Sequence, residues 1–124
     1  RAGNVSTENV FITVGNASSS DAALAITSLG VAPNPTRLAS DTLEIHYRIT
    51  QDANMSFYLL SLDGQLKWSR SFIKGENFSR KDAHYRLLMD PKSTGLSPGV
   101  YILYVKAHYQ DSFDVESIKI AILP

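Results

Sequence analysis

Histidines are the first candidates for metal binding or acid–base chemistry, because imidazole changes charge near neutral pH. His46, His84 and His108 lie far apart in the sequence, without the i, i+4 spacing that places two ligands on one helix face. The chain contains no cysteine, so thiolate ligands and disulfide bonds are excluded. Each histidine falls in a strand-like run, at a position expected to point outward or sideways. We therefore expect surface histidines, with neither a metal site nor a cofactor.

Acidic and hydroxyl side chains offer little more for catalysis. Asp111, Asp114 and Glu116 are close enough in sequence to share a calcium ion, but they lack the regular spacing of a calcium-binding loop. We expect them to form a solvated acidic edge instead. No serine lies in the strand–turn–helix setting of a hydrolase nucleophile, and no glycine-rich phosphate loop is present. The sequence therefore predicts no catalytic residues, and we do not expect an enzyme.

Aromatic side chains suggest one further kind of chemistry, the binding of sugars. Trp68, Phe72 and Tyr85 would form an aromatic strip if they all pointed outward from neighbouring strands. Aromatic residues at strand spacing more often belong to the core, where they bury a large apolar area. Both interpretations stay open at this point, and the core interpretation is favoured.

Acceptor sequences for glycans are more numerous. Four Asn-x-Ser sequences place candidate N-glycans on Asn4, Asn16, Asn54 and Asn77. Thr42 lies in an Asp-Thr-Leu sequence that resembles the short O-glycosylation motif of Bacteroidota. All of these residues fall in expected loops or at strand ends, where a glycan fits. Either the acceptor sequences are used, or they reflect a serine-rich composition. They favour an extracellular or cell-surface protein.

Size and charge limit the classes of function. A chain of 124 residues is large enough for one domain with a core. Lys and Arg together number 12, as do Asp and Glu, so the formal net charge is zero. This balance argues against nucleic acid or an anionic membrane as partner, and it does not oppose self-association. No apolar run approaches about 18 residues, so we expect no insertion into a membrane.

The elements that position these residues are expected to be β-strands. Residues 42–49 place Leu43, Ile45, Tyr47 and Ile49 on one face and polar residues on the other, which is the period of a half-buried strand. Similar alternation recurs in the runs 65–73, 83–89, 100–109 and 116–123. The run 54–62 is apolar on both faces, which indicates a central strand or one that lies against a neighbour. About seven short strands separated by turn residues indicate an all-β fold, an immunoglobulin-like antiparallel β-sandwich.

Two turn sequences set the boundaries of these strands. Asp63-Gly64 lies between apolar runs and predicts a two-residue hairpin with a type I′ turn, which requires positive φ at both residues. Pro33-Asn34-Pro35 combines two residues that lack an N–H group and restrict the residues before them. We expect a stiff, extended corner that ends the first strand of the domain, and a structural role for Asn34.

The order of the turn motifs resembles a known group of bacterial modules. Three motifs carry the resemblance: Pro33-Asn34-Pro35, Leu62-Asp63-Gly64, and Leu96 with Gly99 and Tyr101. From about residue 29 to 123 the chain resembles the type IX secretion C-terminal sorting domains and the FlgD-like immunoglobulin modules. The resemblance implies a β-sandwich from a bacterial surface or secreted protein.

The first 28 residues are expected to form an arm, followed by the sandwich domain at 29–124. Within the arm, the run Val10–Val14 is strand-like, and a serine-rich connector follows it. A single strand of this length is not stable alone. It is the last strand of a preceding domain, an extra strand on its own sandwich, or a strand donated to a neighbouring copy.

Donation to a neighbour leads to our first functional hypothesis. The chain would be a non-catalytic extracellular structural protein, a subunit of a surface filament whose main partners are copies of itself. Val10, Ile12 and Val14 would fill an acceptor groove, with Phe11 and Thr13 on the other face. The alternative is a C-terminal sorting or anchoring module of a larger secreted bacterial protein. A third hypothesis is a carbohydrate-binding module, with glycans as partners.

Overall fold

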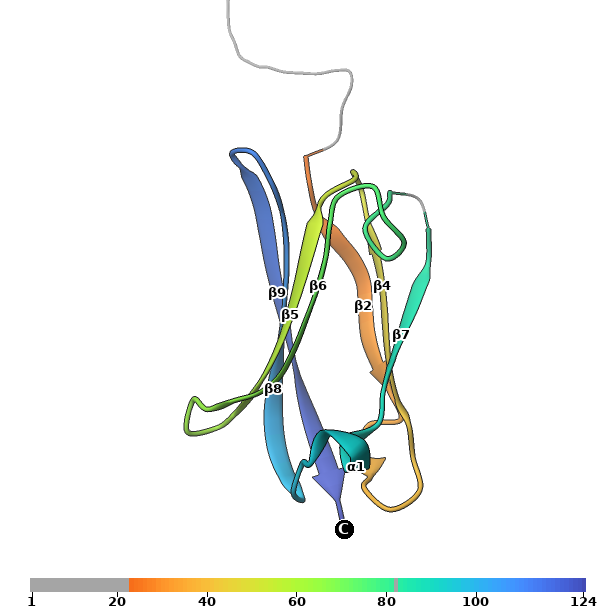
Figure 1. The fold of residues 1–124 in the computed structure, drawn as a ribbon, viewed down its shortest axis with the longest axis vertical. Coiled ribbons are helices and arrows are strands. Elements are labelled where there is room, and N and C mark those ends of the chain that lie inside the picture. Colours follow the sequence, from red (N-terminus) through yellow and green to blue (C-terminus); the bar gives the residue numbers. More distant parts are fainter. Residues whose placement is uncertain (1–22, 82) are drawn as a thin grey trace, which may run out of the picture.

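The computed structural model describes residues 23–81 and 83–124 as a two-layer β-sandwich (Figure 1). A three-stranded sheet of order β2-β4-β7 faces a five-stranded sheet of order β3-β9-β8-β5-β6. The elements are β2 (Ile26–Ala32), β3 (Thr36–Arg37), β4 (Leu43–Ile49), β5 (Asn54–Ser61), β6 (Leu66–Phe72), β7 (Tyr85–Met89), α1 (Pro91–Thr94), β8 (Gly99–Tyr109) and β9 (Ser112–Leu123). The all-β sandwich is therefore confirmed. The strand-like run Val10–Val14 lies outside the described residues.

The period-two patterns form the core as expected. In β4, Leu43, Ile45 and Tyr47 are completely buried, while Arg48 between Tyr47 and Ile49 is exposed. The same alternation holds in β7, β8 and the second half of β9. Their buried residues are Tyr85, Leu87, Met89, Tyr101, Leu103, Val105, Ala107, Ile120 and Ile122. Two inner faces of alternating apolar residues thus meet between the layers.

The sandwich begins earlier than the expected boundary at residue 29. Strand β2 starts at Ile26, which is buried and pairs with Ile49 of β4. Leu24 also belongs to the buried core. Residues 26–28, which the sequence pattern places in the arm, are therefore part of the three-stranded sheet.

The proline corner carries the chain from one sheet to the other. Strand β2 ends at Ala32 and β3 begins at Thr36, so the corner does end the first strand. The backbone bends at 33–35 instead of staying extended, and both bonds preceding the prolines are cis. The amide of Asn34 then pairs with β9: Nδ2 donates to the oxygen of Lys119 at 2.9 Å, and Oδ1 accepts from the nitrogen of Ala121 at 3.1 Å. Asn34 thus takes the place of a strand residue at this edge.

The β5–β6 hairpin exists, but the predicted type I′ turn is wrong. Gly64 has φ +90°, whereas Asp63 is not among the residues with positive φ. The N–H of Gly64 donates to the oxygen of Ser61, and the N–H of Ser61 donates to the oxygen of Gln65, both at 2.9 Å. These bonds enclose a three-residue loop, in which only the glycine takes the left-handed conformation. A register shift follows directly in the strand pair.

Two local structures follow β7. Helix α1 is not among the elements expected from the sequence. Asp90 caps its start by accepting a hydrogen bond from the N–H of Lys92 at 3.0 Å, and Gly95 ends it with φ +80°. After it, the buried Tyr101 donates its hydroxyl to the oxygen of Ser97 at 2.6 Å and accepts from the nitrogen of Ser97 at 3.2 Å. This is the tyrosine corner found in immunoglobulin-like sandwiches. It fixes the entry into β8.

Candidate functional site

The two lateral flanks of the sandwich differ. On one flank β2 lies against β9, and hydrogen bonds join the sheets. The N–H of Ile26 donates to Oδ2 of Asp114 at 2.9 Å, and Asn34 pairs with β9 near the other end. Strand β3 covers the last residues of β9 by parallel pairing. We call this side the closed flank.

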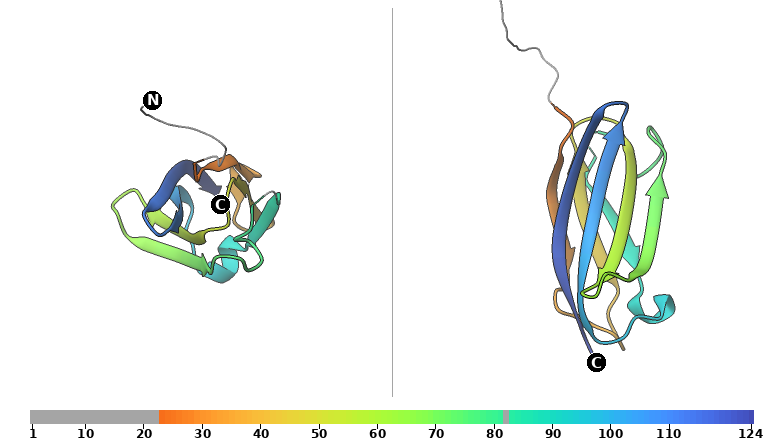
Figure 2. Two further views of the ribbon diagram at one scale, coloured as in Figure 1. Left: turned by 90° about the horizontal axis from the view of Figure 1, so that it is seen from above. Right: turned by 90° about the vertical axis from the view of Figure 1, so that its left-hand side faces the viewer.

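The opposite side lies between β6 and β7, the last strands of their sheets, and we call it the open flank. Figure 2 (right) shows β6 at the margin of the five-stranded sheet. Within the described part of the chain, no hydrogen bond joins β6 to β7. The outer edges of both strands also lack a main-chain partner there. The two edge strands therefore present free N–H and C=O groups on the same flank of the sandwich.

Aromatic rings cover the core at the open flank. Trp68, Phe72 and Phe78 are half-buried and pack against the core. The ring centroid of Phe78 lies 4.9 Å from that of Phe72 and 5.3 Å from that of Tyr85, which is buried. The exposed aromatic strip considered for sugar binding is therefore not formed. These residues seal one side of the core, and they do so incompletely.

Strand β7 presents apolar side chains on both faces. Leu87 and Met89 are each 4% exposed and point into the core, whereas Leu88 points outward and is 56% exposed. An edge strand with free main-chain groups and an exposed leucine can accept a further strand. The sequence carried a signal for this feature, because three successive apolar residues do not fit a strand with one solvated face.

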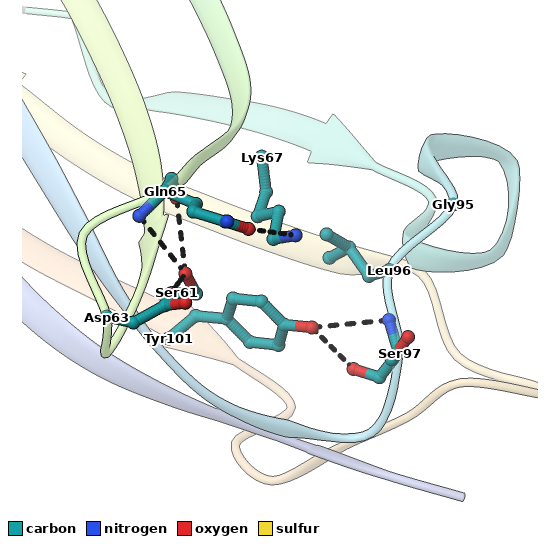
Figure 3. Close-up of a pocket in the computed structure, with 8 residues that line it drawn as sticks. All are labelled: Ser61, Asp63, Gln65, Lys67, Gly95, Leu96, Ser97 and Tyr101. Carbon is teal, nitrogen blue, oxygen red and sulfur yellow. Dashed lines mark hydrogen bonds between the residues drawn. The ribbon is translucent and has the colours of Figure 1, made fainter.

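A pocket of about 230 Å³ lies at one end of the open flank, between the β5–β6 hairpin and the turn after α1 (Figure 3). Ser61 donates its hydroxyl to Asp63, and this bond, helped by the N–H of Gln65, holds the pKa of the Asp63 carboxyl below its usual value. Lys67 Nζ donates to Oε1 of Gln65 at 3.1 Å. Tyr101 is already bonded to the backbone. The polar groups thus satisfy one another, and they do not form a nucleophile–base pair.

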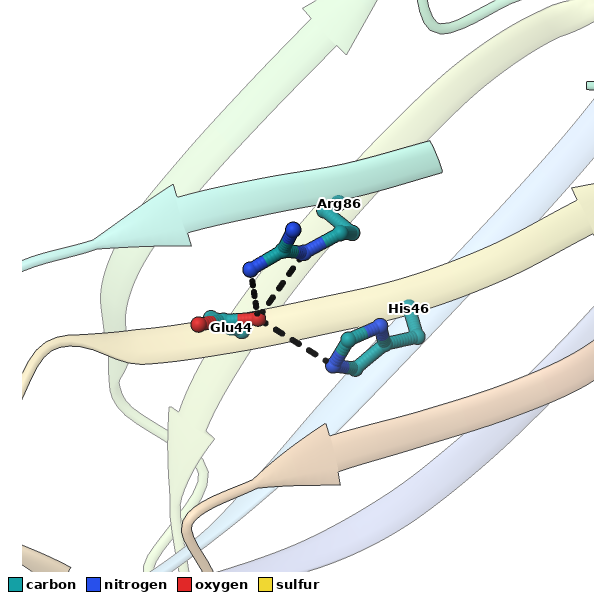
Figure 4. A network of polar contacts seen from close by, with 3 residues as sticks. All are labelled: Glu44, His46 and Arg86. Atoms are coloured by element: carbon teal, nitrogen blue, oxygen red, sulfur yellow. Dashed lines mark hydrogen bonds and ion pairs between the residues drawn. The ribbon is translucent and has the colours of Figure 1, made fainter. Parts of the chain in front are cut away.

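His46 and His108 lie on the outer faces of β4 and β8, and His84 lies in the loop before β7. Glu44 Oε1 accepts a hydrogen bond from Arg86 Nε at 3.1 Å and forms an ion pair with Arg86 Nη2 at 3.0 Å (Figure 4). The same oxygen lies 3.4 Å from His46 Nε2. The ring centroid of His84 lies 5.8 Å from that of His46. His108 is half-buried on β8. In residues 23–81 and 83–124, no three histidine, aspartate or glutamate side chains are placed to hold a metal ion.

The acidic residues of the calcium hypothesis lie in or beside β9. Asp111 lies in the turn before β9, and Asp114 and Glu116 lie on the strand itself. The carboxylate of Asp114 accepts the N–H of Ile26 and so has a structural contact. Asp111 and Glu116 are exposed, which fits the expected solvated edge.

The glycan acceptors that can be located have different surroundings. Asn54 begins β5, and its Oδ1 accepts from the N–H of Lys74 at 2.8 Å. Asn77 is exposed, but the hydroxyl of Ser79 in its acceptor sequence is fully buried and has no hydrogen-bond partner in the described residues. Thr42 is exposed in the loop before β4. Asn4 and Asn16 lie outside the described residues.

Comparison with protein-family models, with curated proteins and with solved structures finds no match for this chain. The resemblance to sorting domains and FlgD-like modules therefore stays a prediction. In the described residues, no helix is long and apolar enough to cross a membrane.

Proposed function

We propose that this chain is a non-catalytic structural subunit that polymerises by β-strand addition at the cell surface or outside the cell. The strand-like run Val10–Val14 of one copy pairs with a free strand edge of the next copy. The observation that carries the proposal is the open flank, where the edges of β6 and β7 lack partners within the described residues, whereas side-chain hydrogen bonds bridge β2 and β9 on the opposite flank.

The composition of the arm supports this pairing. If the run pairs as a strand, Val10, Ile12 and Val14 would share one face, and the run carries no charge. Main-chain hydrogen bonds supply affinity in strand addition, and alternate side chains supply specificity by filling pockets. The zero net charge of the chain means that successive subunits do not repel one another.

The connector is long enough for exchange between copies. Residues 15–22 separate Val14 from the first described residue, and about eight extended residues span roughly 25–30 Å. This distance allows an arm to leave its own sandwich and reach a neighbour. It also allows the arm to fold back on its own sandwich, so the test must distinguish the two.

Light scattering and negative-stain microscopy on the full chain and on a version lacking residues 1–20 test the proposal. We expect polymers from the full chain and folded monomers from the shortened one. Folded monomers from both would contradict it and would favour a sorting or binding module. A monomeric full chain that is more stable than the shortened one would mean that the arm folds on its own sandwich.

A matched pair of substitutions tests the role of the arm without deleting it. Ile12→Lys places a charge on the face expected to enter the groove, whereas Thr13→Lys places the same charge on the other face. We expect Ile12→Lys to abolish polymers and Thr13→Lys to preserve them. Equal effects of the two substitutions would contradict pairing as an alternating strand.

A further inference from the structure

Resting on the proposed function, we propose that the acceptor is the outer edge of β7. The run Val10–Val14 of a second copy would become the fourth strand of the three-stranded sheet. Val10, Ile12 and Val14 would lie over the inner face of β6, and Phe11 and Thr13 would point to the outside. Four observations lead to this edge in preference to β6.

The first observation is the unequal width of the two sheets. Strand β2 lies against β9, which aligns the sheets at the closed flank. From that side, one sheet continues as β2, β4 and β7, and the other as β9, β8, β5 and β6. The second sheet therefore extends one strand beyond β7. A strand added to β7 would fill the position opposite β6, where sheets of a sandwich normally pack face to face.

The burial of the inner faces agrees with this geometry. Phe57 on β5 is fully buried, whereas Trp68 and Phe72 on the neighbouring inner face of β6 are only half-buried. Arg70, between them, is exposed, and its guanidinium carbon lies 5.1 Å from the ring centroid of Phe72. Phe78 already covers part of Phe72, with their ring centroids 4.9 Å apart. An apolar strand at β7 would cover Trp68 and the remainder of Phe72, and the long stem of Arg70 would let its charge remain in water.

The edge of β6 is a poorer acceptor. Lys67 and Arg70 lie along it, and charged residues on an edge strand oppose further pairing. A strand added beyond β6 would also face no opposing sheet, so its apolar residues would stay in water. Strand β7 also carries a charged residue, Arg86, but its guanidinium is paired with Glu44 of β4. A strand added at β7 would face β6, and the inner residues Leu87 and Met89 already lie in the core.

The outer face of β7 offers a cross-strand neighbour. Leu88 is 56% exposed and is the side chain that an added strand would place beside Phe11 or Thr13. Directly opposed side chains on paired strands come within contact distance. Pairing with Phe11 would therefore cover an exposed leucine that the described fold leaves in water.

Cysteine crosslinking in the full chain tests the assignment, because these 124 residues include no cysteine that would interfere. One pair of variants combines Leu88→Cys with Phe11→Cys or with Thr13→Cys. The matched control variants carry Ser69→Cys in place of Leu88→Cys, again together with Phe11→Cys or Thr13→Cys. Ser69 lies on the exposed outer face of β6. We expect covalent ladders between subunits from the Leu88 variants under mild oxidation, since a disulfide needs Cα atoms within about 7 Å.

The outcomes separate the acceptor edge from the proposed function. Polymers that crosslink through Ser69→Cys, or through neither position, would overturn the assignment to β7 and leave polymerisation intact. Absence of polymers in the unsubstituted full chain would overturn the proposed function itself. Fluorescence gives an independent readout, because Trp68 is the one tryptophan of the chain. We expect its emission to shift to the blue on polymerisation, and an unchanged emission would contradict coverage of β6.

Discussion

A single hydroxyl group holds the turn into β8. Because Tyr101 both donates to and accepts from Ser97, Tyr101→Phe removes two hydrogen bonds without changing the packing of the ring. We expect a loss of about 1–2 kcal/mol in the free energy of unfolding, measured by urea denaturation. Tyr104→Phe is the control: its ring is 41% exposed on the same strand, and it should change stability by less than about 0.5 kcal/mol. Equal losses would exclude the corner as the cause.

A second tyrosine makes stability depend on pH at the alkaline end. Tyr47 is fully buried and donates to the oxygen of Phe78 at 2.6 Å. Burial, with the nearby Tyr85 as a smaller cause, raises the pKa of Tyr47 far above its usual value. The unfolded chain therefore loses this proton above about pH 10 while the folded chain keeps it, so stability is complete below that pH and falls above it.

Denaturation at a series of alkaline pH values checks this prediction. Ionisation of Tyr47 in the unfolded chain alone contributes a slope of up to about 1.4 kcal/mol per pH unit above about pH 10. Tyr47→Phe should be less stable at neutral pH, because it lacks the bond to Phe78, but its alkaline slope should be smaller by this amount. Identical slopes for the two proteins would show that the phenol ionises in the folded state.

At the scale of single elements, the β5–β6 hairpin depends on one glycine. Gly64 has φ +90°, and the space that a Cβ atom would occupy there is open, so Gly64→Ala costs conformational energy without a clash. We expect a loss of roughly 1–2 kcal/mol. Gly30→Ala in β2 is the matched control, since Gly30 has ordinary φ and equally open surroundings. It should be neutral or stabilising by up to about 1 kcal/mol. Thermal unfolding of both variants measures the two changes in stability. A loss of stability in Gly30→Ala as large as that in Gly64→Ala would mean that the positive φ of Gly64 is not the cause.

Strands with one solvated face are readily predicted from the sequence, because apolar and polar residues alternate along them as successive side chains point to the buried and the solvated face. Residues such as Leu43 and Ile45 are assigned to the buried face from spacing alone, and both are fully buried. Short-range geometry was harder. The dipeptide Asp63-Gly64 is compatible with two loop lengths, and hydrogen bonds of Ser61 select the longer one. Helix α1 has clear end signals at Asp90 and Gly95, but it is too short to show a helical period.

The candidate site could be predicted only in part. The alternation of the run Val10–Val14 is visible in the sequence, and so is the unusual apolar run at the end of β7. Which strands have free edges cannot be read from the sequence, because it depends on the order of strands in the two sheets. Likewise, Asn34 was expected to be structural, but its pairing with β9 joins residues that are 85 and 87 positions apart.

At the scale of the whole molecule, the balance of charges predicts how polymers respond to salt. The proposed contact uses main-chain hydrogen bonds and apolar side chains, and the net charge is zero. Raising the ionic strength from about 0.1 M to about 1 M shortens the Debye length from about 10 Å to about 3 Å. We expect polymers to persist through this change when followed by light scattering. Dissociation at high salt would mean that ion pairs hold the subunits together.

The direction of the terminal strands has a mechanical consequence. Strand β2 runs down from the top of the sandwich and β9 ends at the bottom, on the same flank (Figure 1). Tension between the start of β2 and the end of β9 would pull along the strands and load the β2–β4 and β8–β9 hydrogen bonds in shear. Bonds loaded in this way must rupture together, whereas a peeled strand loses them one at a time. A chain of such modules would resist stretching well beyond the force that opens a hairpin.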